Sequence, residues 1–187
     1  PNQLPAKRCA VITDRNVGPH YARATERSLR TAGFDPLFIE VPAGERAKSL
    51  QVVGRCYDRL ARHRLERRSF LVALGGGVVG DVTGYVASAF RRGVPYVQLP
   101  TTLLAQVDSS IGGKVAINHP RGKNLVGAFY PPRLVLSDPA LLAPIAAGWE
   151  AAARDRGRPT IAMSLFVRLM VVKQRSGWAM RRSCVRY

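Results

Sequence analysis

The apolar residues of this chain fall into short continuous runs, separated by stretches with helical spacing. Five of the runs are predicted to be strands, at residues 8–13, 36–41, 69–74, 95–99 and 134–137. Three stretches with a period near 3.6 are predicted to be helices, at residues 21–31, 48–62 and 79–91. Gly33 follows the first of these helices, where a glycine commonly ends a helix.

This alternation predicts the fold class. Strands that are apolar along their whole length are covered on both faces, as in parallel sheets flanked by helices. We therefore expect an α/β fold, a doubly wound and mostly parallel sheet, over residues 1–144. Residues 145–187 differ, because they are rich in Ala and Arg and carry nine basic side chains against two acidic ones. They are predicted to be an atypical basic tail, with a short helix over residues 161–173.

The cysteine content, the length of the apolar runs and the net charge limit the classes of protein to which the chain can belong. The three cysteines Cys9, Cys56 and Cys184 are widely spaced and form no CxxC pair, which favours a reduced, cytoplasmic protein over a disulfide framework. No apolar run approaches the roughly 20 residues of a membrane span. The net charge of +17 is spread along the chain without interleaved aromatic residues. Solvated helix faces and attraction for anionic small substrates explain this charge at least as well as a nucleic-acid partner, which is the less favoured alternative.

A glycine-rich turn follows the third predicted strand. Gly75, Gly77 and Gly80 satisfy the pattern GxGxxG, in which backbone N–H groups can approach a pyrophosphate at a helix start. A plain tight turn is the alternative. No acidic residue follows about 20 positions later to hold a ribose hydroxyl, so an ordinary Rossmann dehydrogenase is poorly supported.

Polar residues also follow the first two predicted strands. Asp14 and Asn16 follow the first, and Glu45 and Lys48 follow the second. A carboxylate at such a place can accept hydrogen bonds from ribose hydroxyls. The alternative interpretation is a solvated first turn of a helix.

The segment over residues 99–127 is the richest in candidate chemistry. It places two threonines, an aspartate, two lysines, two asparagines and a histidine in what we expect to be loops with four glycines. Lysines beside glycines suit phosphate and carboxylate groups, which need point charges and close backbone approach. His119 precedes a proline and has no second histidine at metal-ligand spacing, so we expect a solvated or capping residue and no metal site.

Three segments resemble the 3-dehydroquinate synthase family of sugar phosphate cyclases. They are GGGVVGD at residues 75–81, LPTTLLAQVDSSIGGK at residues 99–114 and INHPRGKN at residues 117–124. The resemblance covers roughly residues 9–142 and implies a Rossmann-like NAD-binding domain. The family's DGExxK element reads AGERAK here, with Ala43 at the position of its aspartate.

The resemblance implies site residues at matching positions. For NAD it implies Asp14, Asn16, Glu45, Lys48, Gly76, Gly77, Val78, Val79, Gly80, Asp81, Thr101, Thr102, Asp108, Lys114 and Lys123. For substrate and catalysis it implies Lys114, Asn124, Asp108 and Arg92, the last reaching the substrate phosphate of a neighbouring subunit in a homodimer.

The implied reaction converts 3-deoxy-arabino-heptulosonate 7-phosphate to 3-dehydroquinate through transient oxidation by NAD and loss of phosphate, a step of the shikimate pathway. The family's divalent metal, zinc or cobalt, is bound by one Glu and two His of a helical second domain, and we find no such ligands in this chain. We expect that domain to be missing or replaced, through truncation or a frameshift, and the chain alone to be inactive. The alternatives are a non-catalytic NAD-binding fragment or a glycerol-dehydrogenase-like oxidoreductase.

Overall fold

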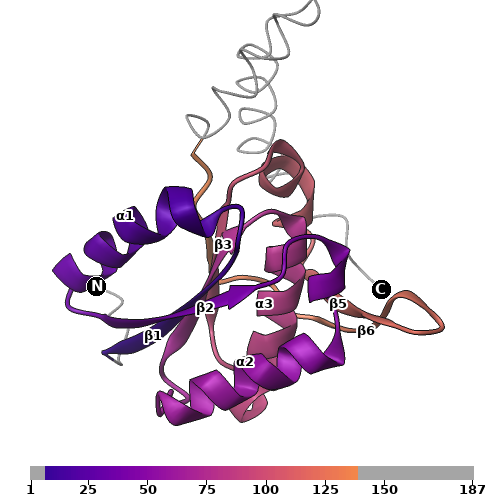
Figure 1. Ribbon diagram of the computed structural model, residues 1–187, viewed down its shortest axis with the longest axis horizontal. Coiled ribbons are helices and arrows are strands. Elements are labelled where there is room, and N and C mark those ends of the chain that lie inside the picture. The colour runs from indigo at the N-terminus through magenta and orange to yellow at the C-terminus, as the bar shows by residue number, and fades with distance from the viewer. Residues whose placement is uncertain (1–6, 139–187) are drawn as a thin grey trace, which may run out of the picture. The chain divides into compact units, whose positions relative to one another are not determined.

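The computed structural model describes residues 7–138 and places a five-stranded parallel sheet at their centre (Figure 1). The strands lie in the order β2-β1-β3-β4-β7, and every pairing is parallel. Their bounds are Arg8–Asp14 for β1, Asp35–Val41 for β2, Phe70–Gly75 for β3, Tyr96–Pro100 for β4 and Leu134–Val135 for β7. The predicted parallel sheet is confirmed, although β7 has two residues where four were expected.

Helices cover both faces of this sheet (Figure 1). Helix α1 (Gly18–Thr31) packs on one face, and helices α2 (Leu50–Arg62) and α3 (Gly77–Ala89) pack on the other. Alternate residues of β1 serve the two cores: Cys9 and Val11 face α1, whereas Ala10 and Ile12 face α2 and α3. The central strands β1 and β3 bury side chains on both faces of the sheet, so they show no polar alternation, and the doubly wound fold is confirmed.

Two helix ends differ from the prediction for local reasons. Helix α1 begins at Gly18, three residues earlier than expected, because Pro19 suits the first turn and leaves no needed N–H unsatisfied. Helix α3 ends at Ala89, and a short turn (η2, Phe90–Arg92) follows it. Arg91 and Arg92 have φ values of 53° and 65°, a left-handed conformation that a continuing helix does not allow.

The segment over residues 99–127, which we expected to be loops, contains an antiparallel hairpin. Strands β5 (Lys114–His119) and β6 (Gly122–Phe129) form it, after a π-helical turn (η3, Ala105–Ser109). At Gly127 a Cβ atom would lie only 2.4 Å from the carbonyl oxygen of Val115. The prediction of loops was wrong because some of these glycines permit close strand approach rather than turns.

The hairpin packs against α3, and a glycine in that helix allows the close contact. Val115 and Ile117 of β5 are buried in the core shared with α3. A Cβ at Gly84 would lie 2.3 Å from Val115 Cγ1, so the missing side chain lets the hairpin approach the helix.

Within residues 7–138 no helix combines the length and the apolar character that a bilayer crossing requires.

Candidate functional site

The strand order changes direction between β1 and β3: β2 is added on one side of β1, and β3, β4 and β7 are added on the other. The glycine turn follows β3, at this topological switch point. Residues 75–77 connect β3 to α3 at the carboxyl edge of the strands, where open α/β sheets bind ligands. Gly76 is the N-cap of α3 and offers no side-chain cap, so the first amide groups of the helix lack such a partner.

The glycines allow neighbouring side chains to lie close to the backbone of this turn. A Cβ at Gly76 would lie 3.2 Å from Thr102 Cγ2, and one at Gly77 would lie 3.0 Å from Ser109 Oγ. The backbone amide of Thr101 donates to the carbonyl of Gly75 at 3.0 Å, which fixes the turn beside the end of β4. The predicted phosphate-binding turn is therefore closely packed against the residues that follow β4, and its binding role stays a prediction.

Lys48 is the centre of a polar network that joins three parts of the chain. Its side chain is 4% exposed, and its Nζ donates to Asp81 Oδ2 at 2.6 Å and to Asn124 Oδ1 at 2.5 Å. Lys48 follows the short helix η1 (Glu45–Ala47), Asp81 lies in the second turn of α3 and Asn124 lies on β6. A lysine is so deeply buried only when its charge is paired.

Asp81 carries a raised pKa. Burial is the main cause, because it disfavours the charged carboxylate, and the nearby charge of Glu45 raises the pKa further. The hydrogen bond and the charge of Lys48 act in the opposite direction. Asp81 is therefore a partly buried carboxylate whose ionised form is stabilised by Lys48.

Asn118 holds the hairpin against the loop that bears Glu45. Its Nδ2 donates to Glu45 Oε2 at 2.8 Å, its Oδ1 accepts from the amide of Asn124 at 2.9 Å, and its own amide donates to the carbonyl of Lys48 at 2.8 Å. Asn124 has a φ of 55°, which an asparagine tolerates better than most residues. Asn118 was not among the predicted site residues, although its place in a polar stretch was a signal.

A cavity of about 390 Å³ opens beside this network. Asp81 and Asn124 line it together with Lys114 at the start of β5, and Phe129 forms part of its wall. Phe129 is 81% exposed. The structure thus brings together Lys48, Asp81, Lys114 and Asn124, residues that lie up to 76 positions apart in sequence.

Other predicted residues do not join this network. Asp14 Oδ1 accepts from the amides of Asn16 and Val17 at 2.8 and 3.0 Å, so it also shapes the turn before α1. Thr102, Asp108, Lys123 and Arg92 are exposed and show no side-chain ion pair among the described residues. Their binding roles stay predictions.

His119 has a structural role in the hairpin turn. Its side chain is exposed, and its Nδ1 accepts from the amide of Arg121 at 3.2 Å, which agrees with the expected capping residue. Within residues 7–138 no three His, Cys, Asp or Glu side chains are grouped so that they could hold a metal ion. Glu150 and the rest of the tail lie outside the described residues.

Two buried hydroxyl groups at the carboxyl edge have no hydrogen-bond partner within the described part of the chain. They are Thr101 Oγ1, just after β4, and Thr13 Oγ1, near the end of β1. Thr101 is 7% exposed and Thr13 is 3% exposed. Buried hydroxyls are normally paired, so a polar ligand at this edge would satisfy an existing need.

Comparison with known proteins identifies relatives of this chain. A family model described as 3-dehydroquinate synthase N-terminal matches residues 38–163. The 3-dehydroquinate synthase of Desulforamulus reducens is 54% identical over 136 residues, which are 73% of this chain and 38% of that protein. That of Geobacter metallireducens is 57% identical over 129 residues, or 69% of this chain and 36% of that protein. The chain therefore spans less than two fifths of these relatives.

Solved structures give the same picture. A 2-deoxy-scyllo-inosose synthase complexed with carbaglucose-6-phosphate, NAD+ and Co2+ matches with a TM-score of 0.68 at 32% identity, over 72% of this chain and 36% of that one. The 2-epi-5-epi-valiolone synthase of Streptomyces hygroscopicus, with NAD+ and Zn2+ bound, matches with a TM-score of 0.66 at 35% identity, over 75% and 39%. A glycerol dehydrogenase from Schizosaccharomyces pombe, 24% identical with a TM-score of 0.56 over 73% and 32%, shares the fold.

Proposed function

The chain belongs to the 3-dehydroquinate synthase family, and from this premise we propose that the protein is a cytoplasmic, NAD-dependent lyase of this kind. Its substrate would be 3-deoxy-arabino-heptulosonate 7-phosphate and its product 3-dehydroquinate, with phosphate released. The observation that carries the proposal is the convergence of Asp81, Lys114 and Asn124 on one cavity, with Lys48 hydrogen-bonded to Asp81 and Asn124. An anionic, hydroxylated substrate suits such a set of charges and amides.

The glycine turn fits NAD. Side chains at Gly76 and Gly77 would crowd Thr102 and Ser109, whereas glycines leave the backbone amides of the turn uncovered. The unpaired Thr101 Oγ1 offers a donor and an acceptor at the same edge. When bound, NAD would supply a reversible acceptor for hydride.

Lys48 would act by neutralising Asp81. An unpaired carboxylate in α3 would repel the anionic groups of a cofactor or substrate at the start of this helix. With Lys48 at 2.6 Å the pair has no net charge, so the positive helix end and the exposed Lys114 set the local potential. Lys114 and Lys123 would then hold carboxylate or phosphate oxygens as point charges.

Two further features are proposed for the whole protein. A divalent cation is supported by the Co2+ and Zn2+ bound in the related cyclases, but residues 7–138 offer no group of ligands for it. Homodimer formation is also proposed, with the exposed Arg92 reaching the substrate phosphate of the neighbouring subunit.

Two matched glycine variants test the cofactor site. Gly77→Ala places a Cβ 3.0 Å from Ser109 Oγ, whereas Gly54→Ala, in α2, meets nothing within 4 Å. We expect the 187-residue chain to bind NAD weakly in calorimetry, Gly77→Ala to lose at least about tenfold in affinity, and Gly54→Ala to match the parent. Equal affinities in all three proteins would contradict the proposed site.

The reaction requires a separate experiment, because we expect the chain alone to release no phosphate. In a hybrid, this chain's matched residues would replace the corresponding 136-residue region of the Desulforamulus reducens relative. We expect phosphate release from the heptulosonate phosphate that depends on NAD. A folded hybrid that binds NAD but releases no phosphate would refute the proposed reaction, and hybrid oxidation of glycerol would favour the oxidoreductase alternative.

A further inference from the structure

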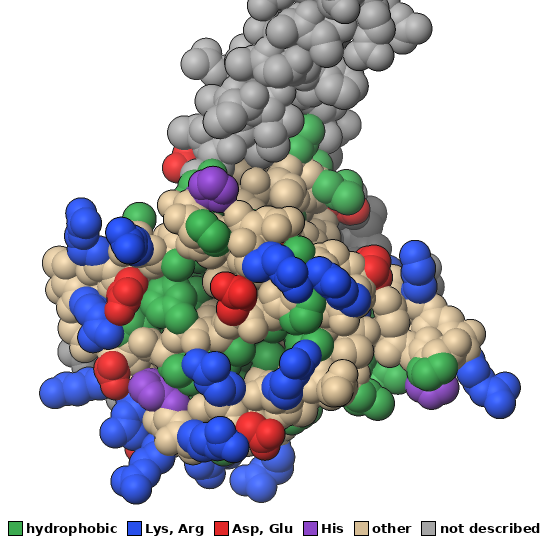
Figure 2. All heavy atoms as spheres, in the orientation of Figure 1, with side chains coloured by type: hydrophobic (Ala, Val, Ile, Leu, Met, Phe, Trp, Pro, Cys, Tyr) green, Lys and Arg blue, Asp and Glu red, His purple; other side chains and the backbone are tan. Residues whose placement is uncertain are grey.

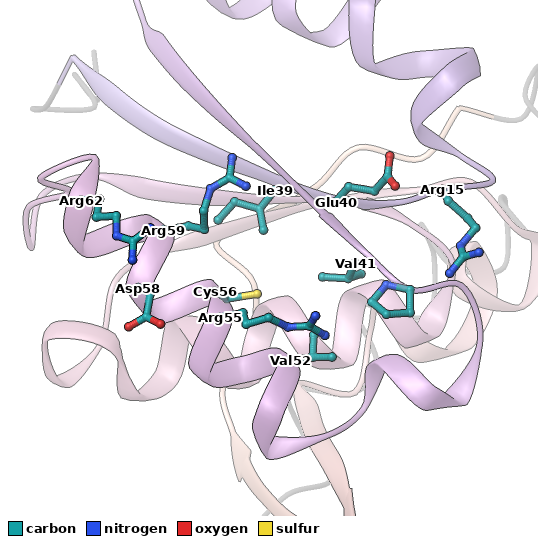
Figure 3. Close-up of a pocket in the computed structure, with 11 residues that line it drawn as sticks. Arg15, Ile39, Glu40, Val41, Val52, Arg55, Cys56, Asp58, Arg59 and Arg62 are labelled. Atoms are coloured by element: carbon teal, nitrogen blue, oxygen red, sulfur yellow. The ribbon is translucent and has the colours of Figure 1, made fainter.

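A second cavity, of about 510 Å³, lies between α2 and the free edge of β2 (Figure 3). Strand β2 is the first in the sheet order, so its outer edge has no strand neighbour within the described part of the chain. Ile39, Val41, Val52 and Cys56 give the cavity an apolar and buried floor. Its volume is within the range of about 300–1,000 Å³ typical of small-molecule sites. None of the residues implied for NAD or substrate lines it.

Four arginines surround this floor. Arg55, Arg59 and Arg62 follow the i, i+4, i+7 spacing of one helix face, and Arg15 comes from the turn between β1 and α1. Figure 3 shows Arg15 beside the loop end of β2 and Arg62 near the other end of the cavity. Positive charge thus flanks the apolar floor from two elements.

These arginines lack anionic partners. Within residues 7–138 none of the four forms an ion pair with a carboxylate within 4.0 Å. Glu40 and Asp58 also line the cavity, which leaves two positive charges in excess. Figure 2 shows Lys and Arg side chains gathered over α2 with few acidic ones among them. Gathered like charges repel, and an anion bound between them would relieve the repulsion.

Part of the cavity is held in place before any ligand arrives. Arg59 Nη2 donates to the carbonyl oxygen of Phe38 on β2 at 3.0 Å, which ties α2 to the strand edge. The turn that carries Arg15 is fixed by the two amide hydrogen bonds to Asp14 Oδ1. Fixed donors lose less conformational freedom on binding, which favours a specific ligand over diffuse attraction.

We propose that this cavity is a binding site for a small organic anion with two separated phosphate or carboxylate groups. The arginines at each end of the cavity would bind one anionic group of the ligand, since guanidinium forms bidentate hydrogen bonds with phosphate and carboxylate. The apolar floor would contact the carbon skeleton between the two groups. This site is separate from the proposed cofactor site, so either can fail without the other.

Calorimetry on the 187-residue chain tests the proposal, with fructose 1,6-bisphosphate as the probe and orthophosphate as a single-anion comparison. We expect saturable binding of one bisphosphate per chain, at least about tenfold tighter than orthophosphate. Arg55→Gln/Arg62→Gln should weaken it at least about tenfold. The matched control is Arg67→Gln/Arg68→Gln, which removes equal charge from exposed arginines outside the cavity, and it should bind as the parent does.

Three results would overturn the proposal: no saturable binding, an equal loss in both double variants, or displacement of the bisphosphate by equimolar duplex DNA. The second would mean diffuse attraction by net charge, and the third a nucleic-acid surface. Circular dichroism of each variant checks that it is folded, and Arg15→Gln, on another element, gives an independent loss of binding. NAD binding is measured on the same samples, so a failed cofactor proposal is recognised separately.

Discussion

Replacing Lys48 by methionine tests the polar network at its centre. The substitution keeps most of the aliphatic stem and removes the ammonium group that pairs with Asp81 at 2.6 Å. Removing one partner of a buried ion pair costs about 3–5 kcal/mol, because the other charge is left uncompensated. The Asp81 side chain is 24% exposed and water can solvate it in part, so we expect a loss of about 2–4 kcal/mol in the free energy of unfolding at neutral pH.

The loss should depend on pH with a definite sign. Burial already raises the pKa of Asp81, and Lys48→Met removes both interactions that lower it. A carboxyl whose folded-state pKa exceeds its unfolded value stabilises the fold below the unfolded pKa, and that contribution disappears as pH rises through the folded pKa. Lys48→Met should therefore be least impaired in acid and most impaired at neutral pH.

Urea unfolding monitored by circular dichroism, at several pH values, measures both effects. The double variant Lys48→Met/Asp81→Asn is the control, because it removes the stranded charge as well. It should recover more than half of the lost stability at neutral pH and show little of the pH dependence. The reasoning would be refuted if Lys48→Met cost less than about 1 kcal/mol, or if both variants were equally destabilised at every pH.

Three further predictions concern other parts of the fold. Asn118→Ala removes the hydrogen bonds to Glu45 and to the Asn124 amide and should cost about 1–2 kcal/mol in urea unfolding, since these groups are partly solvated. Gly84→Ala would place a Cβ 2.3 Å from Val115 Cγ1, and overpacking should cost about 1–3 kcal/mol in thermal unfolding. Burial raises the pKa of the Cys56 thiol to about 11. Peptide mapping after treatment with a disulfide reagent at pH 8 should therefore find Cys56 modified only in unfolded protein.

The sequence predicted those features of the site that depend on neighbouring residues. GGGVVGD after an apolar run placed a phosphate-binding turn between a strand and a helix, and β3 and α3 flank it as expected. The family was also evident, because unusual residues agreed in order and spacing over the matched region. The predicted start of a basic tail at residue 145 stays a prediction, since it lies outside the described residues.

The hydrophobic pattern did not predict the hairpin or the contacts of Asn118, because both depend on contacts between segments distant in sequence. The alternate burial in β5 is short and follows two glycines that suggest a loop. Gly127 is needed because the carbonyl of Val115 on the partner strand lies where a side chain would begin. Asn118 likewise appeared to be one polar residue among many. Two of its three hydrogen bonds reach the loop of Glu45 and Lys48, about 70 residues earlier in the chain.

By itself, the sequence determined the strands of the parallel sheet, the helices that cover its two faces and the glycine turn, because each follows from local periodicity and from backbone conformations that few residues adopt. Only the tertiary structure decided which charges meet. Lys48 reads as a solvated helix start in sequence, yet packing of α3 and the hairpin buries it and pairs it with Asp81 and Asn124. The arginines of α2 become a cavity wall only beside the edge of β2. Burial and pairing are properties of surfaces brought together by folding, and no single segment encodes them.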